Sequence, residues 1–158
     1  EVQGYQEAKA EAEVIAQERL EAEAAAEAAR KAEEERKAAE AARLEMRQGI
    51  VDFALQFEGN PYVYGGTSLT NGADCSGFVM SVYANFGVSL PHSSSADRSQ
   101  GSAVDGLANA QAGDLICYSG HVALYIGNGQ IVHASTAKTG IIVSNADYKK
   151  VLAVRRIF

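Results

Sequence analysis

The feature of this sequence that most limits its fold is an abrupt change of composition at Gly49. Residues 5–48 consist mainly of alanine, glutamate, lysine and arginine, and no proline or glycine interrupts them. These residue types favour helix strongly, so we expect this segment to form one long α-helix. From Glu21 to Arg43 no apolar side chain is larger than alanine. The hydrophobic core must therefore come from the residues after the change.

The helical segment has few means of packing against another helix. A coiled-coil seam needs bulky apolar residues at two positions of every heptad, and the centre of the segment has none. We therefore expect residues 1–48 to be a solvated helical spacer. A weak coiled coil, and an inhibitory arm that folds back over the functional site, are the alternatives.

Charge and hydropathy exclude several classes of protein. Residues 1–48 carry 13 acidic and 8 basic side chains, which leaves residues 49–158 nearly neutral within a net charge of −6. A nucleic-acid partner is not expected without a basic face. No apolar run reaches the roughly 18 residues of a membrane span. The chain begins without methionine, so we expect a trimmed fragment, in which the lack of a signal peptide does not argue against secretion.

Residues 49–158 show helical patterns first and strand patterns later. Ile50, Phe53, Ala54 and Phe57 would share one face of a helix over residues 50–57, and a second helix is predicted from about Ser76. Residues 89–114 have the character of a long connection with one short helical turn. Five short β-branched segments follow, "DLICYS", "HVALYIG", "QIVHAS", "GIIVS" and "VLAVRRIF". This order predicts an α+β domain with an antiparallel sheet.

The stretch "GADCSGFVM" places a cysteine at the start of the second predicted helix. Asp74 is a suitable N-cap, which puts Cys75 in the first helical turn. The helix dipole and free backbone N–H groups are expected to stabilise the thiolate there, the form that acts as a nucleophile. A small core cysteine is the alternative, but the polar and glycine-rich flanks do not favour it.

Two histidines could serve such a nucleophile. His121 begins one predicted strand, His133 ends the next, and "GNG" between the strands predicts a tight hairpin. The two rings are therefore expected on neighbouring strands, where one imidazole could orient the other. The third histidine, His92, lies on the long connection and is expected to be a cleft wall or a surface residue.

A zinc site is the competing interpretation of these side chains. Cys75, Cys117, His121 and His133 are separated by 42, 4 and 12 residues and contain neither a CxxC nor an HExxH motif. No metal or other cofactor is therefore expected. Cys117 lies within an alternating strand pattern and is expected to be a small buried hydrophobe.

Together these motifs resemble the NlpC/P60 family of cell-wall cysteine peptidases. The resemblance covers about residues 50–158 and rests on "NPYVYGG", "ADCSGFV", "LPHSS", "AGDLICY" and "GHVALYIGNGQIVHAS". It implies a papain-like fold, in which the helix that carries the nucleophile packs on an antiparallel sheet that carries the histidines. It also implies hydrolysis of peptidoglycan stem peptides, typically between γ-D-glutamate and the following diamino acid.

The resemblance assigns a role to individual residues. It implies that Cys75 is the nucleophile, His121 the general base and His133 the group that orients His121. The backbone N–H of Cys75 and the hydroxyl of Tyr62 would stabilise the oxyanion.

Two further residues and a location follow from the same resemblance. Asp74 and Ser76 would line the pocket for the amino-terminal end of the stem peptide, where Asp74 could hold a free α-amine. The family also implies a secreted protein that acts at the bacterial cell wall, with wall-binding modules upstream of this fragment. An amidase or transferase of the same class, and a wall-binding scaffold with a silent site, remain the rival interpretations.

Overall fold

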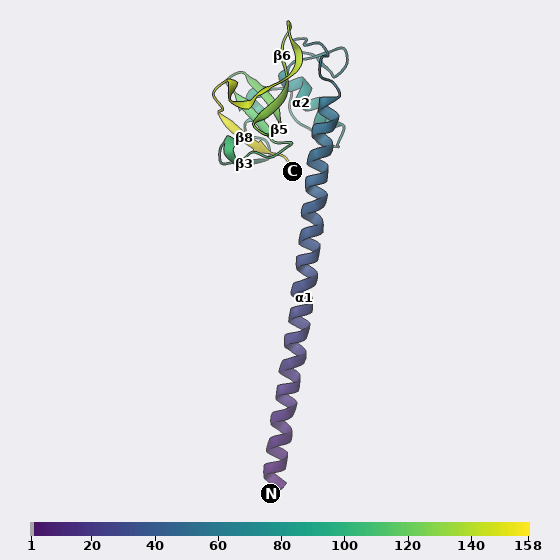
Figure 1. Ribbon diagram of the computed structural model, residues 1–158, viewed down its shortest axis with the longest axis vertical. Helices are drawn as coiled ribbons and strands as arrows, with labels where there is room; N and C mark the ends of the chain where they lie inside the picture. Colours follow the sequence, from purple (N-terminus) through teal and green to yellow (C-terminus); the bar gives the residue numbers. More distant parts are fainter. Residues whose placement is uncertain (1) are drawn as a thin grey trace. The chain divides into compact units, whose positions relative to one another are not determined.

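The computed structural model describes residues 2–158. The chain divides into two compact units, one that ends at Ala42 and one that comprises Arg43–Phe158. Helix α1 (Val2–Leu55) supplies all of the described part of the first unit (Figure 1). Every described residue up to Ala42 is exposed. The expected solvated helix is thus confirmed for this unit, which has no buried core.

Helix α1 continues without interruption through Gly49, where the sequence predicted a boundary between two helices. An interior glycine costs about 1 kcal/mol relative to alanine, which tertiary packing easily offsets. That packing comes from Ile50, Val51 and Ala54, which are buried, and from Phe53, which is partly buried. The predicted apolar face of residues 50–57 is therefore confirmed, while a domain boundary between residues 48 and 49 stays a prediction.

The second unit contains a six-stranded antiparallel sheet in the order β3-β8-β4-β5-β6-β7. Its strands are β3 (Ser102–Val104), β4 (Leu115–Tyr118), β5 (His121–Gly127), β6 (Gln130–Thr136), β7 (Gly140–Asn145) and β8 (Ala153–Arg156). The last five coincide with the five predicted segments. Strand β3, seen beside β8 in Figure 1, lies inside the predicted connection and was not expected.

Shorter elements complete this unit. They are β1 (Thr67–Ser68), β2 (Gly72–Ala73), α3 (Ser94–Asp97) and the 3₁₀ turns η1 (Leu107–Asn109) and η2 (Ala146–Tyr148). Helix α3 is the single helical turn expected in the connection. No helix among residues 2–158 combines the length and the apolar character that crossing a bilayer requires.

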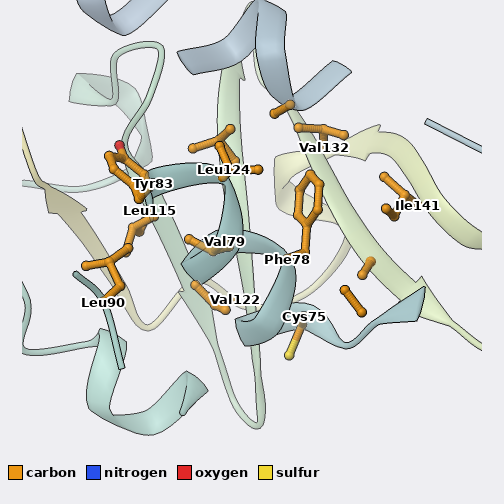
Figure 2. Close-up of a cluster of buried hydrophobic side chains, with 14 of the residues drawn as sticks. Cys75, Phe78, Val79, Tyr83, Leu90, Leu115, Val122, Leu124, Val132 and Ile141 are labelled. Carbon is orange, nitrogen blue, oxygen red and sulfur yellow. The ribbon is translucent and has the colours of Figure 1, made fainter. Parts of the chain in front are cut away.

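Helix α2 (Cys75–Ala84) packs its apolar stripe on one face of the sheet. Figure 2 shows Phe78 and Val79 of this helix against strand residues Val122 and Leu124, with Cys75 at one end of the cluster. The alternate strand residues face the opposite side and form a second buried cluster, which includes Tyr118, Ala123, Tyr125 and Ile131. The α+β prediction, with the cysteine helix packed on an antiparallel sheet, is confirmed.

The β5–β6 hairpin turns at Asn128 and Gly129, which both have positive φ (53° and 75°). Two positive values are typical of a type I′ turn, which matches the twist of a β-hairpin. The turn, together with a register shift between Tyr125 and Gly127, gives a register in which Leu124 pairs with Val132. His121 and His133 therefore lie on the same face of neighbouring strands, as diagonal neighbours.

Candidate active site

The site begins at the first residue of helix α2. Asp74 is the N-cap, and its Oδ1 accepts a hydrogen bond from the backbone N–H of Gly77 at 2.8 Å. Cys75 follows directly and is 9% exposed. It opens into a pocket of about 310 Å³, which Gly120, the residue before His121, also lines. The predicted placement of Cys75 in the first turn of a helix is confirmed.

The protonation state of Cys75 differs from the expectation. Burial raises the pKa of the thiol, and the charge of Asp74 raises it further. The backbone N–H groups of Val122, Ser76 and Cys75 itself lower it, but they do not outweigh burial. In the free protein the cysteine is therefore a thiol at neutral pH, and it could act as a nucleophile only after a base had removed its proton.

His121 and His133 form a direct contact. His121 Nε2 lies 2.7 Å from His133 Nδ1, and the two rings meet edge to face. His121 begins β5 immediately before Val122, whose N–H acts on the Cys75 sulfur. Strand β5 thus carries His121 directly beside the residue whose N–H reaches the sulfur at the start of α2. The pocket lining, by contrast, includes neither ring among the described residues.

Two tyrosines and a serine enclose this pair. Tyr118 packs on His121, with ring centroids 5.8 Å apart, and Tyr148 packs on His133 at 5.3 Å. The hydroxyl of Ser144 lies 2.9 Å from His133 Nε2. His133 is fully buried and His121 is 8% exposed.

This enclosure decides the charge of the imidazoles. Burial lowers the pKa of His121 to about 4, with smaller contributions from His133 and Lys149. Burial and Lys149 likewise lower the pKa of His133 to about 4. Both rings are thus neutral at neutral pH, the form in which an imidazole can accept a proton.

Asp74 connects three segments of the pocket wall. Its Oδ2 accepts a hydrogen bond from the backbone N–H of Gly65 at 2.9 Å, and its Oδ1 lies 2.7 Å from His92 Nε2. Burial alone would raise the pKa of this carboxyl, but the hydrogen bonds from His92, Gly77 and Gly65 outweigh it and lower the pKa. The pocket therefore holds an ionised carboxylate, and His92 is a wall of the cleft, one of the two places expected for it.

The remaining predicted residues also reach this pocket. Tyr62 and Ser76 line it, and Ser76 is buried. Burial and then the neighbouring Cys75 and Asp74 raise the pKa of the Tyr62 phenol. Tyr64 lines the mouth and is 88% exposed. Of the two tyrosines, Tyr62 is thus the one placed beside the sulfur.

The zinc interpretation receives no support from the geometry. Cys117 is fully buried in the core that α2 shares with the sheet, as predicted. Among residues 2–158 no group of three or more histidine, cysteine, aspartate or glutamate side chains is arranged to hold a metal ion.

Sequence reasoning missed Ser144 and Tyr148, and it did not foresee the contact between His92 and Asp74. Ser144 follows Ile142 at strand spacing, and Ile142 is the register partner of His133, so strand pairing would have pointed to it. Tyr148 lies on the 3₁₀ turn η2, for which the sequence offers no periodic signal.

Comparison with known proteins places this fold and site in a family. Residues 59–156 match the NlpC/P60 family. The chain belongs to the NlpC/P60 family.

Named relatives and a solved structure agree with this membership. The chain is 39% identical over 104 residues to a probable endopeptidase of Corynebacterium glutamicum. The aligned region covers 64% of this chain and 49% of the relative. It is 37% identical over 108 residues to the murein DD-endopeptidase MepS/murein LD-carboxypeptidase of Escherichia coli K12, which covers 65% of this chain and 56% of the relative. The peptidoglycan hydrolase RipB of Mycobacterium tuberculosis superposes with a TM-score of 0.65 at 34% identity, over 73% of this chain and 67% of that chain. The chain thus spans about half the length of the curated relatives that it matches.

Proposed function

We propose that this protein is a peptidoglycan hydrolase, a cysteine endopeptidase that cleaves stem peptides through a thioester intermediate. The observation that carries the proposal is the 2.7 Å contact between His121 Nε2 and His133 Nδ1, on the strand whose next residue, Val122, directs its N–H at the Cys75 sulfur. A hydrogen bond at Nε2 leaves His121 Nδ1 as the nitrogen that can take the proton of the thiol. The names of the relatives and of the solved structure support the substrate class.

The first half of the reaction forms the thioester. His121 Nδ1 accepts the thiol proton of Cys75 while the sulfur attacks the amide carbonyl carbon. The resulting oxyanion is stabilised by the backbone N–H of Cys75 and by the Tyr62 hydroxyl, whose raised pKa keeps it protonated and able to donate. His121 then gives its proton to the leaving amine nitrogen, and the carbon–nitrogen bond breaks.

The second half releases the acyl group. A water molecule gives a proton to His121 Nδ1 as its oxygen attacks the thioester carbonyl, and the carbon–sulfur bond breaks. The acid product leaves, and Cys75 returns to the thiol. His133 holds the plane of the His121 ring throughout, which is the role of the third group in such sites.

The polar pocket beside the sulfur supports a preference for stem peptides with a free amino terminus. Asp74 is ionised and buried there, and a charge-assisted hydrogen bond to an ammonium group would be strong in this setting. Ser76 adds a hydroxyl to the same wall. A short peptide bound in this way presents the γ-D-glutamyl–diamino acid bond to Cys75, and we propose this bond as the one cleaved.

The site of action and the role of the helix follow from the same proposal. A peptidoglycan substrate places the protein outside the cell, as a secreted protein at the cell wall. Residues 1–48 would act as a spacer that joins the catalytic domain to upstream wall-binding modules. The exposed, charged surface of residues 2–46 supports a spacer more than a docking element.

Mass spectrometry of a peptidoglycan digest tests the proposal. Purified protein is incubated with free tri- and tetrapeptide stems and, separately, with soluble muropeptides that include cross-linked dimers, and Cys75→Ala serves as the control. Products cut between D-glutamate and the diamino acid are expected from the wild type alone. Cuts at D,D-cross-links would support the hydrolase class but would show that another bond than the proposed one is cleaved. No products from either the free stem peptides or the muropeptides would overturn the function.

A further inference from the structure

Ser144 is the last member of a hydrogen-bonded chain that starts at the proposed base. His121 Nε2 contacts His133 Nδ1 at 2.7 Å, and His133 Nε2 contacts Ser144 Oγ at 2.9 Å. His133 and Ser144 are diagonal neighbours on β6 and β7, because His133 pairs with Ile142. Side chains at such positions on one face of a sheet can touch, so the register itself brings the hydroxyl to the ring.

The direction of these hydrogen bonds decides whether His121 can act as a base. A neutral imidazole carries one N–H and one bare nitrogen. If Ser144 accepts a hydrogen bond from His133 Nε2–H, then His133 Nδ1 is bare and accepts from His121 Nε2–H. His121 Nδ1 is then bare and can take the thiol proton. In the opposite direction Nδ1 of His121 already holds a proton, so this nitrogen has no free lone pair with which to accept the thiol proton.

The burial of His133 makes Ser144 the group that determines which nitrogen of this ring carries the proton. His133 is fully buried beneath Tyr148, so bulk water does not compete for its Nε2. Ser144 is only half-buried. Its oxygen can therefore accept a hydrogen bond from the His133 ring while its own hydroxyl proton is donated to solvent. No hydrogen-bond donor is then left without a partner.

The charge that develops during the reaction favours the same direction. When His121 takes the thiol proton it becomes an imidazolium, and an acceptor lone pair on His133 Nδ1 stabilises that cation. An acceptor at Ser144 in turn polarises His133, because hydrogen bonds in a chain strengthen one another. Each link is thus aligned to support positive charge on His121.

We propose that Ser144 is a positioning residue that accepts a hydrogen bond from His133 Nε2–H and thereby keeps Nδ1 of His121 free to act as the base. The proposal rests on the proposed function in so far as it concerns the rate. Its statement about the tautomer of His133 holds for the free protein and can be tested without substrate.

The experiment compares the full chain with Ser144→Ala, Ser144→Thr and the control Ser102→Ala, which changes an exposed serine on β3. Long-range ¹H–¹⁵N spectra of protein labelled at the histidine nitrogens report which ring nitrogen of His133 carries the proton. Steady-state kinetics on one free stem tetrapeptide give kcat and KM for each protein, and kcat is also followed against pH.

The wild type and Ser144→Thr are expected to show His133 with its proton on Nε2, whereas Ser144→Ala shows a mixture of tautomers. In Ser144→Ala kcat should fall about tenfold, the equivalent of one lost hydrogen bond, with KM unchanged. Ser144→Thr should restore kcat to within about twofold because it keeps the hydroxyl, and Ser102→Ala should match the wild type.

Two results would overturn the proposal. One is a wild-type His133 with its proton on Nδ1. The other is a Ser144→Ala protein that keeps the wild-type kcat and tautomer. If Ser144→Ala does not fold, the wild-type tautomer and the threonine variant still decide the question. An Nε2–H tautomer in a protein without any muropeptide hydrolysis would refute the proposed function while leaving the tautomer assignment standing.

Discussion

His92 Nε2 lies 2.7 Å from Oδ1 of Asp74, the residue that caps the helix carrying Cys75. One carboxylate thus joins the loop at Gly65, the start of α2 and the connection that holds His92. Oδ1 already has two hydrogen-bond partners, Gly77 N–H and His92 Nε2, and Oδ2 has one, Gly65 N–H, so the carboxylate can accept one further hydrogen bond. That capacity suits the free amine proposed for the substrate.

Asp74→Asn should weaken the binding of stem peptides that have a free amino terminus. Asparagine keeps the N-cap, so the helix start is preserved, but it loses the negative charge that pairs with an ammonium group. We expect KM to rise about 10- to 100-fold, the range for a hydrogen bond to a charged group. The same peptide acetylated at its amino terminus is the control, and an equal loss on both peptides would contradict an amine-binding role.

The two histidines should differ in how much their replacement costs. His121→Ala removes the proposed base, and general base catalysis contributes about 10²- to 10⁴-fold. His133→Gln keeps a polar group beside His121, so the loss in kcat should be about tenfold. Measured kcat values for the two variants check the order. A larger loss in His133→Gln than in His121→Ala would reverse the assigned roles.

The acid limb of the pH profile should lie well below the pKa of a free imidazole. Burial lowers the pKa of His121 to about 4, and the neutral ring is the form that accepts the thiol proton. The kcat/KM of the enzyme is therefore expected to hold as pH falls through 6.5 and to be lost only near the lowered value. A limb at or above 6.5 would show that the ring is not desolvated as the structure has it.

Tyr148→Ala should move that acid limb upwards. The ring of Tyr148 packs on His133 and lies 6.4 Å from the ring of His121, so its removal admits water to the pair. Better hydration stabilises the protonated imidazoles and raises their pKa towards 6.5. Tyr5→Ala, which removes an exposed tyrosine from the other unit, is the matched control. An unchanged limb in Tyr148→Ala would exclude this shielding role.

Asp97 should make the protein less stable as the pH rises. Its side chain is fully buried and neither carboxylate oxygen has a hydrogen-bond partner in the protein among the described residues. Burial raises the pKa of Asp97 to about 7. Because the folded pKa exceeds the unfolded one, the stabilising contribution of the neutral acid is complete below about pH 4 and is lost as the pH rises to about 7.

The substitution Asp97→Asn isolates this effect. It removes the charge with little change of shape, so the variant should gain about 1–3 kcal/mol over the wild type between pH 4 and pH 8. Urea unfolding at both pH values measures the difference. A free-energy difference that does not change with pH would show that Asp97 is already neutral, or charged and compensated, across this range.

The point of truncation should matter for the helical segment. Arg47 is buried and donates to Phe158 O at 3.0 Å and to Gln111 Oε1, so residues 43–48 belong structurally to the domain. A protein of residues 43–158 should keep the wild-type Tm and turnover of soluble muropeptides. A protein of residues 49–158 loses these hydrogen bonds and should be less stable by about 1–3 kcal/mol. A large gain in turnover on removing residues 1–42 would favour an inhibitory arm over a spacer.

Most of the fold could be predicted from the sequence, because helix caps, turn residues and strand patterns are local features of the chain. The five strands from Leu115 onwards are rich in β-branched residues and are separated by turn residues, and the N-cap residue Asp74 marks the start of α2. Strand β3 was not predicted, because a strand of three residues is too short to show an alternating hydrophobic pattern. Helix α1 continues through Gly49 because the low helix propensity of one residue is weaker than the packing of Ile50 and Ala54.

The sequence predicted which residues lie at the site, but it did not predict their protonation states. Position in the first turn indicated a stabilised thiolate at Cys75, whereas burial raises the pKa of that thiol. Burial depends on segments distant in the chain, which no local pattern reveals. The same holds for Ser144 and Tyr148, whose contacts with His133 depend on strand register and on the turn that follows β7.

The nucleophilic role of Cys75 is tested most directly by the turnover of Cys75→Ala on a defined stem peptide with a free amino terminus, with circular dichroism and Tm as checks of folding. We expect a folded protein without measurable cleavage, together with a covalent acyl adduct on Cys75 of the wild type in quenched samples analysed by mass spectrometry. A folded Cys75→Ala protein that cleaves at the wild-type rate would contradict the nucleophilic role of this sulfur.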